Sequence, residues 1–262
     1  MTAIRIAIVC AGAVAMSGTA HAQEERDEAV GVTATASATA RAAEDGAFLS
    51  MTLAPRTGTT AAFAVAFGGY DSAAKSPRFD SVAEVHLWGP ADLRGGATYS
   101  AAGDRMRPNV GLRVQLFRQE AHGLDGSVGV FYKAEGFTEP EGEIETILSA
   151  GARFGALSLV GNLAYGQDPE GNERDGEARA AVFRSWRAVS VGFDARARFA
   201  LGVQRAAAAV REPRVDLAAL PFASVVVGPV ALFAQAGPSA LRLANSDLVV
   251  GVTALGGVGA AF

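Results

Sequence analysis

Cysteine is nearly absent from this chain of 262 residues, since Cys10 is the only one. Histidine is also scarce, and only His86 and His122 lie beyond position 22. Once the first 22 residues are set aside, disulfides, thiol chemistry and cysteine-ligated metals are excluded. No charge-free apolar run approaches the length needed for a membrane-spanning helix. The formal net charge of −4 does not favour binding of nucleic acid through bulk charge, so no such partner is expected.

The first 22 residues have the parts of a secretory signal peptide. Arg5 supplies a positive charge, Ile6–Met16 is a short apolar run, and Ala20–Ala22 forms an A-x-A cleavage site before Gln23. We expect cleavage after Ala22 and export of the remaining chain. Residues 23–58 begin acidic and become rich in Ala, Thr and Ser. They are interpreted as an N-terminal periplasmic tail or as extra strands.

From Thr59 to Phe262, apolar residues alternate with small or polar ones in one segment after another. In Val189–Leu201, for example, Val191 and Phe193 alternate with Gly192 and Asp194. Successive side chains of a strand point to opposite faces, so this alternation predicts strands with one apolar face. About twelve such segments can be counted, with 10 or 14 as alternatives. Long and tight connections also alternate between them, which a soluble β-sandwich does not require.

The last fifteen residues carry the sharpest motif. Leu248–Phe262 reads LVVGVTALGGVGAAF, with apolar residues two, four and six positions before the terminal Phe262. This segment resembles the closing strand of Gram-negative outer-membrane β-barrel proteins. The resemblance implies an all-β fold, a single antiparallel transmembrane β-barrel over residues 59–262, in the cell outer membrane. It also implies outer-membrane lipids, lipopolysaccharide and the barrel-assembly machinery as partners, with Phe262 as the assembly signal.

Details of several strands test this interpretation. Trp88, Phe154, Trp186 and Phe262 lie beside the tight turns, as expected of an interfacial aromatic girdle. Trp88 shares parity with acidic Glu84, so its strand needs a β-bulge if Trp88 is to face lipid. Pro238, in the eleventh strand, predicts a second bulge that reverses the parity of that strand.

Charged residues on the inward parity are the candidate functional residues. The lumen or constriction candidates are Arg113, Lys133, Glu135, Glu145, Arg153, Asp194, Arg196 and Arg198, and Arg179 shares their parity. One interpretation is an ion-paired interior that fills the barrel, because charges in a narrow lumen must be paired or wet. The other is a charged constriction that selects solutes, with a mild preference for anions.

Catalysis and metal binding have weak support in the sequence. Neither His86 nor His122 has a Ser and an acid at a spacing that identifies a catalytic set. The acidic stretches at 136–143 and 168–176 lack the spacing of a calcium loop. We therefore expect no enzyme, cofactor or metal site, and predict a narrow channel for small ions or solutes. A structural or adhesive barrel with a plugged lumen is the alternative, and an outer-membrane lipid hydrolase is less favoured.

Overall fold

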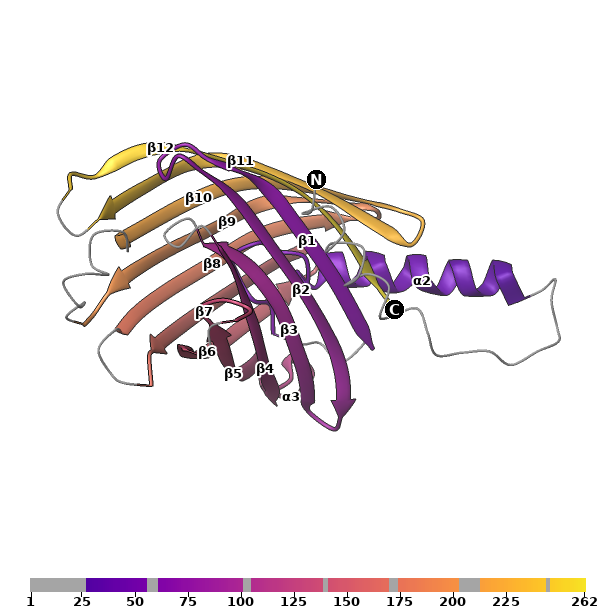
Figure 1. Cartoon of the computed structure of the whole chain (residues 1–262). Helices are drawn as coiled ribbons and strands as arrows, with labels where there is room; N and C mark the ends of the chain where they lie inside the picture. Colours follow the sequence, from indigo (N-terminus) through magenta and orange to yellow (C-terminus); the bar gives the residue numbers. More distant parts are fainter. Residues whose placement is uncertain are drawn as a thin grey trace.

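The computed structural model describes residues 27–55, 61–100, 105–138, 141–169, 174–202, 213–243 and 246–262. The expected signal peptide, residues 1–22, lies outside these ranges. Twelve described strands form a closed antiparallel barrel (Figure 1), which confirms the predicted fold. The strands are β1 (Ala62–Asp71), β2 (Ser76–Trp88), β3 (Ala91–Ser100), β4 (Arg105–Phe117), β5 (Asp125–Ala134), β6 (Gly142–Phe154), β7 (Leu157–Gln167), β8 (Arg174–Trp186), β9 (Val189–Ala200), β10 (Pro213–Val227), β11 (Val230–Leu243) and β12 (Val249–Ala261).

The barrel closes where β12 pairs with β1, in a register that runs from Phe63 opposite Ala261 to Asp71 opposite Thr253. The alternation of β12 has the predicted outcome. Val250 is 72% exposed on the exterior, whereas Thr253 is buried. Exposed apolar side chains cover the outside of the other strands too, as a surface in contact with lipid requires. Among the described residues, no helix is both long and apolar enough to cross a membrane.

Tight turns gather at one end of the barrel and longer connections at the other. Gly89, Gly155, Arg187 and Gly228 begin two-residue turns with φ between 51° and 63°. Such turns need a left-handed residue because their twist then matches that of the paired strands. One connection at this end instead contains a single helical turn, α3 (Gln119–His122). We call this end the turn end and the opposite one the loop end.

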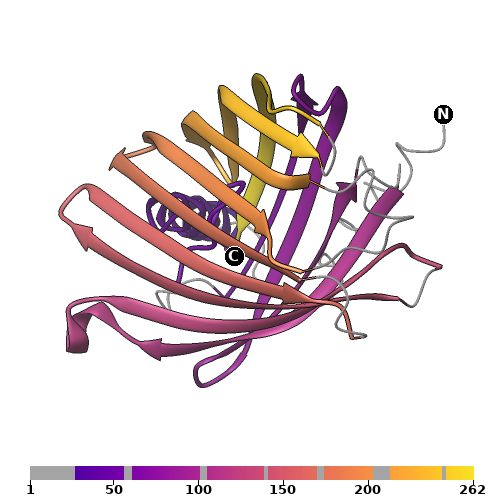
Figure 2. The same cartoon turned by 90° about the vertical axis from the view of Figure 1, so that its left-hand side faces the viewer.

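Helix α2 (Asp27–Glu44) enters the barrel from the turn end. Its first turns project beyond the strands, and Figure 2 shows the helix enclosed by them. Its contacts are with β8, β10, β11 and β12. Gly46, with φ +77°, ends the helix in a Schellman motif, in which the amide of Ala47 donates to the carbonyl of Ala42 at 2.9 Å. Residues 45–55, the plug segment, then continue inside the barrel.

The N-terminal region therefore differs from the sequence-based expectation. The described part of residues 23–58 forms no strand; it forms a helix that projects beyond the turn end with its first turns and enters the lumen with its last, followed by the plug segment within the lumen. The physical reason is visible in strand β1. Phe63, Val65 and Phe67 are the apolar residues in the alternation of β1, yet they point inward and are at most 8% exposed, because they pack against this N-terminal region.

The two predicted bulges have opposite outcomes. The register between β2 and β3 shifts between His86 and Trp88, and Trp88 is 69% exposed, so the first bulge is confirmed. The prediction of a bulge at Pro238 is wrong, since β11 keeps its register with β12 through this residue. Pro221 of β10 lies near Pro238 across the ladder, and pairing lapses there without a change of register. The two prolines have no amide hydrogen to donate, and the ladder loses pairing near them without a shift of register.

Candidate functional site

The lumen is divided into an open half and a filled half. A cavity of about 480 Å³, which we call the vestibule, occupies the half toward the loop end. Its floor is formed by Leu49–Leu53 of the plug segment, and its wall by inward side chains of the strands. Toward the turn end, a cavity beside the plug segment measures about 40 Å³. The plug segment therefore separates the vestibule from the turn end.

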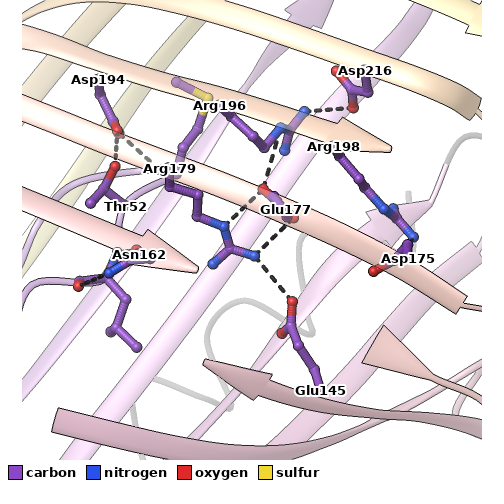
Figure 3. Close-up of polar contacts among 12 residues, drawn as sticks. Thr52, Glu145, Asn162, Asp175, Glu177, Arg179, Asp194, Arg196, Arg198 and Asp216 are labelled. Carbon is purple, nitrogen blue, oxygen red and sulfur yellow. Dashed lines mark hydrogen bonds and ion pairs between the residues drawn. The ribbon is translucent and has the colours of Figure 1, made fainter. Parts of the chain in front are cut away.

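Charged side chains of alternating sign form a belt around the vestibule wall. Arg179 contacts Glu177 at 2.8 Å and Glu145 at 3.1 Å, and Arg196 contacts Asp216 at 2.7 Å (Figure 3). In order of contact the belt consists of Asp71, Arg78, Asp216, Arg196, Glu177, Arg179, Glu145, Lys133, Glu143 and Arg107. Each inner member thus has neighbours of opposite charge, as charges withdrawn from bulk water require.

One contact of the belt crosses between strands that are not neighbours. Arg78 of β2 lies 3.7 Å from Asp216 of β10, although β1, β12 and β11 separate these strands in the sheet. Arg78 also holds Asp71 of β1 at 2.6 Å. The vestibule is therefore narrow enough at this level for one side chain to reach across part of the ring.

Two polar residues of the barrel wall hold the main chain of the plug segment. The side-chain oxygen of Asn162 accepts the Leu53 amide at 2.6 Å, and its nitrogen donates to the Leu53 carbonyl at 2.7 Å. Asp194 accepts the Met51 amide at 2.9 Å and the Thr52 hydroxyl at 2.6 Å. Figure 3 shows Asn162 and Asp194 projecting inward from neighbouring parts of the wall. Both are buried beneath the segment.

Further polar contacts anchor the plug segment at both ends. Arg113 donates to the carbonyl of Ala54 and also pairs with Glu84. Arg153 pairs with Asp45. These contacts reach β4 and β6, so the segment is held from several sides of the barrel.

Apolar side chains complete the docking. Phe48 lies 4.9 Å from Phe233 and 6.1 Å from Phe63, measured between ring centroids. Leu53 packs in a cluster with Phe131 and Ile147. A phenylalanine and a leucine that insert in this way bury apolar surface that water would otherwise contact. The filled half of the lumen is therefore packed like a protein core.

Helix α2 is fixed at the turn end by Thr39. Its hydroxyl lies 3.1 Å from the Pro229 carbonyl and accepts the Ala261 amide at 3.4 Å. Thr39 has no exposed surface. The helix thus contacts both the β10–β11 turn and the last residue of β12.

The structure places seven of the eight candidate residues on inward positions of strands and Glu135 just past the end of β5, and their environments differ. Lys133, Glu145 and Arg196 belong to the belt, while Arg198 pairs with Asp175 beside it. Glu135 pairs with Arg105 near the loop end. The remaining three, Arg113, Arg153 and Asp194, contact the plug segment.

Each of the five cations among the candidates has an acidic partner. These partners are Glu84 for Arg113, Glu145 for Lys133, Asp45 for Arg153, Asp216 for Arg196 and Asp175 for Arg198. The expected preference for anions loses its basis, because it compared positive with negative charge among the sequence candidates alone and left out most of these acidic partners. The interior is ion-paired along the wall, yet it still encloses the vestibule.

Sequence reasoning missed the residues that fill the lumen. Asn162 lies on the inward parity, but an uncharged amide did not stand out beside the charges. The signal for α2 was an Ala-rich stretch followed by Gly46, the pattern of a helix with a glycine C-cap. Its hydrophobic side is weak because Ala and Thr dominate, so the same stretch also read as strand-like. Among the described residues, no group of three or more His, Asp or Glu could hold a metal ion.

Comparison with known proteins places the fold. No protein-family model matches the chain, and no curated protein matches it. Among solved structures, the NanC porin has a TM-score of 0.55 at 9% identity, over 76% of this chain and 100% of that one.

A second porin, KdgM in complex with disordered oligogalacturonate, has a TM-score of 0.54 at 7% identity, over 76% of this chain and 99% of that one. LpxR from Salmonella typhimurium, at 10% identity over 77% of this chain and 100% of that one, has a TM-score of 0.46, which supports no argument. At these identities the likeness concerns the fold and not the function. By its closed twelve-strand barrel with a lipid-type exterior, the chain has the fold of the outer-membrane β-barrel proteins.

Proposed function

We propose that the chain is an outer-membrane channel for small ions or solutes, which its plug segment holds closed. The observation that carries the proposal is the vestibule, a charged cavity of about 480 Å³ whose floor is the plug segment. A lumen that served only as structure would gain nothing from a solute-sized space ringed by ion pairs. Charged rings of this kind select among ions in pores. The likeness to two porins supports the same function.

The proposal includes an orientation and a route to the membrane. The turn end faces the periplasm and the loop end the exterior, since outer-membrane barrels have short periplasmic turns and longer outer loops. Residues 1–22 direct export, and Phe262 marks the chain for barrel assembly. Phospholipid and lipopolysaccharide contact the exposed apolar exterior. The proposal assigns no catalytic step to any residue.

A second candidate is a structural barrel with a permanent plug. It is favoured by the many contacts between the plug segment and the wall, such as those of Phe48 and Leu53 with wall side chains and of Asn162 with the plug segment. The two candidates differ in one property, the ability of the plug segment to leave.

A crosslink tests this difference. Gln235 of β11 donates to the hydroxyl of Ser50 in the plug segment, and the mature chain contains no cysteine. The variant Ser50→Cys/Gln235→Cys is joined by a short bis-methanethiosulfonate, which forms a reducible disulfide with each cysteine, and is placed in a planar bilayer. We expect conductance steps before crosslinking and their loss after it, with recovery on reduction. The two single variants, treated with the same reagent, are the matched controls.

Two results would contradict the proposal. Silence of the wild type and of the uncrosslinked variant, at every voltage and salt, would favour the structural barrel. Equal conductance before and after crosslinking would mean that ions pass beside the plug segment and that it closes nothing.

A further inference from the structure

Between Met51 and Ala54 the plug segment is hydrogen-bonded to the wall largely through its main chain, and this carries an inference about ligand class. We propose that the filled half of the lumen is a binding site for extended peptides, which the plug segment occupies in cis. The inference deepens the proposed channel function and rests on it only for the route by which a peptide arrives. It identifies the ligand as polypeptide rather than a free ion or a sugar.

Asn162 is the first element of the site. Its amide both accepts from and donates to the same residue, Leu53, at 2.6 and 2.7 Å. This pair of bonds copies what a neighbouring strand would offer to an extended residue. Recognition through main-chain bonds gives affinity without requiring a particular sequence. Any extended peptide in the same position could present the same amide and carbonyl.

Asp194 is the second element, and its lack of a cation is unusual in this wall. Among the described residues, none forms an ion pair with Asp194, although it has no exposed surface. Its charge is met instead by the Met51 amide and the Thr52 hydroxyl. A buried carboxylate that lacks a cation needs such donors. Asp194 is therefore matched to a polypeptide and not to the ion-paired belt beside it.

Two adjacent apolar pockets add side-chain preference. Leu53 enters a pocket formed by Phe131, Ile147 and Ala164. The next residue, Ala54, enters another pocket, formed by Val160, Ala181 and Phe183. The preferred peptide thus carries a hydroxyl residue, then a medium-sized apolar residue, then a small one. Outside this triplet, Phe48 packs on Phe233 and Phe63, and Ser50 accepts a hydrogen bond from Gln235.

The experiment frees the site after the full chain has folded. A protease recognition sequence is inserted between residues 58 and 59, the purified barrel is cleaved in detergent, and the N-terminal fragment is washed out. A fluorescein-labelled synthetic peptide of residues 45–55 is then added, and binding is followed by fluorescence anisotropy. Three further peptides are compared: one methylated on the Leu53 amide, one with Ala at positions 50 and 51, and one scrambled throughout.

We expect the 45–55 peptide to bind and methylation at Leu53 to weaken binding at least tenfold, since the methyl removes the donor to Asn162. The peptide with Ala at positions 50 and 51 keeps the triplet and binds within about tenfold of the original, while the scrambled one binds less tightly than either. Asn162→Leu in the barrel weakens binding at least tenfold, whereas Ser149→Ala leaves it unchanged. Ser149 is a buried inward residue that forms no hydrogen bond with the plug segment.

Three outcomes would overturn the inference. The 45–55 peptide fails to bind the freed site, methylation at Leu53 has no effect, or the peptide with Ala at positions 50 and 51 fails to bind. Conductance is not part of the readout. A barrel that conducts but binds no peptide would therefore keep the proposed function and lose this inference, and one that binds peptide without conducting would do the reverse.

Discussion

Phe48 offers the most direct way to loosen the plug segment without touching its polar contacts. Its ring is 4% exposed and packs against Phe233 of β11 and Phe63 of β1. The fit is close, because a β-carbon added at Gly259 of β12 would lie 2.7 Å from the ring. Phe48→Ala removes these contacts and leaves a space that the barrel wall cannot fill.

The expected magnitude follows from this burial. Truncation of a core phenylalanine to alanine costs about 3–5 kcal/mol. Since about 1.4 kcal/mol corresponds to a factor of ten, loss of this energy from the docked state raises the undocked fraction by roughly 100-fold or more. The strands keep their backbone pairing, so the barrel itself should remain assembled.

A single cysteine at Ala54 reports the change. Ala54 is 6% exposed, and Ala54→Cys adds little volume to a chain that has no other cysteine after signal cleavage. We expect a water-soluble maleimide to label this cysteine about 100-fold faster, or more, in the Phe48→Ala background. Phe199→Ala is the control, because Phe199 is 45% exposed on the outside and should leave the rate unchanged.

A labelling rate within threefold of the parent would refute the reasoning, provided that the barrel remains heat-modifiable on a gel. It would mean that the polar contacts alone hold the segment, or that the segment never leaves. An equal acceleration by Phe199→Ala would show that the assay reports general loosening and not undocking.

Three further predictions concern the barrel and its interior. Ala195→Arg, on the lipid-facing parity of β9, should lower the free energy of unfolding by about 2–4 kcal/mol in urea titrations in liposomes, whereas Ala195→Leu should change it little; equal stability of the two variants would contradict the assigned face. Truncation after Gly256 removes the pairing of Phe63–Phe67 with β12, so the chain should remain unfolded in the periplasm, and a heat-modifiable band in the outer membrane would disprove this. The two tryptophans, Trp88 and Trp186, are exposed near the turn end, so lipids brominated close to the headgroup should quench most of the fluorescence and lipids brominated at the chain terminus much less.

The sequence predicts the exterior of this molecule better than its interior. Val191 and Phe193 were assigned to the outside from alternation alone, and both are exposed. The same rule fails at Phe63, because alternation separates two faces but does not say which one meets lipid. An apolar face can pack against lipid or against an apolar part of the plug. Only knowledge of the plug could therefore have decided which face of β1 points inward.

The inward charges show a similar division. The parity of Arg196 and Arg198 was sufficient to place them in the lumen. Their partners, Asp216 and Asp175, lie on other strands and are brought into contact by strand register. Register depends on pairing between distant segments, so charge balance could not be counted along one strand. Asn162 was missed for a different reason, since its role exists only once a peptide lies against it.

Thr39 and Phe48 together touch all three strands around the seam of the ring. Thr39 bonds with Ala261 of β12, while Phe48 packs on Phe63 of β1 and Phe233 of β11. The seam joins the first and last strands and is the one place where the ring can part sideways without breaking a hairpin. The contacts of Thr39 and Phe48 bridge this seam from inside, so they oppose its opening and the sideways escape of lumen contents into the bilayer. They also mean that residues made before β1 complete their contacts only when the last strand arrives, so this bridging is a late event in assembly.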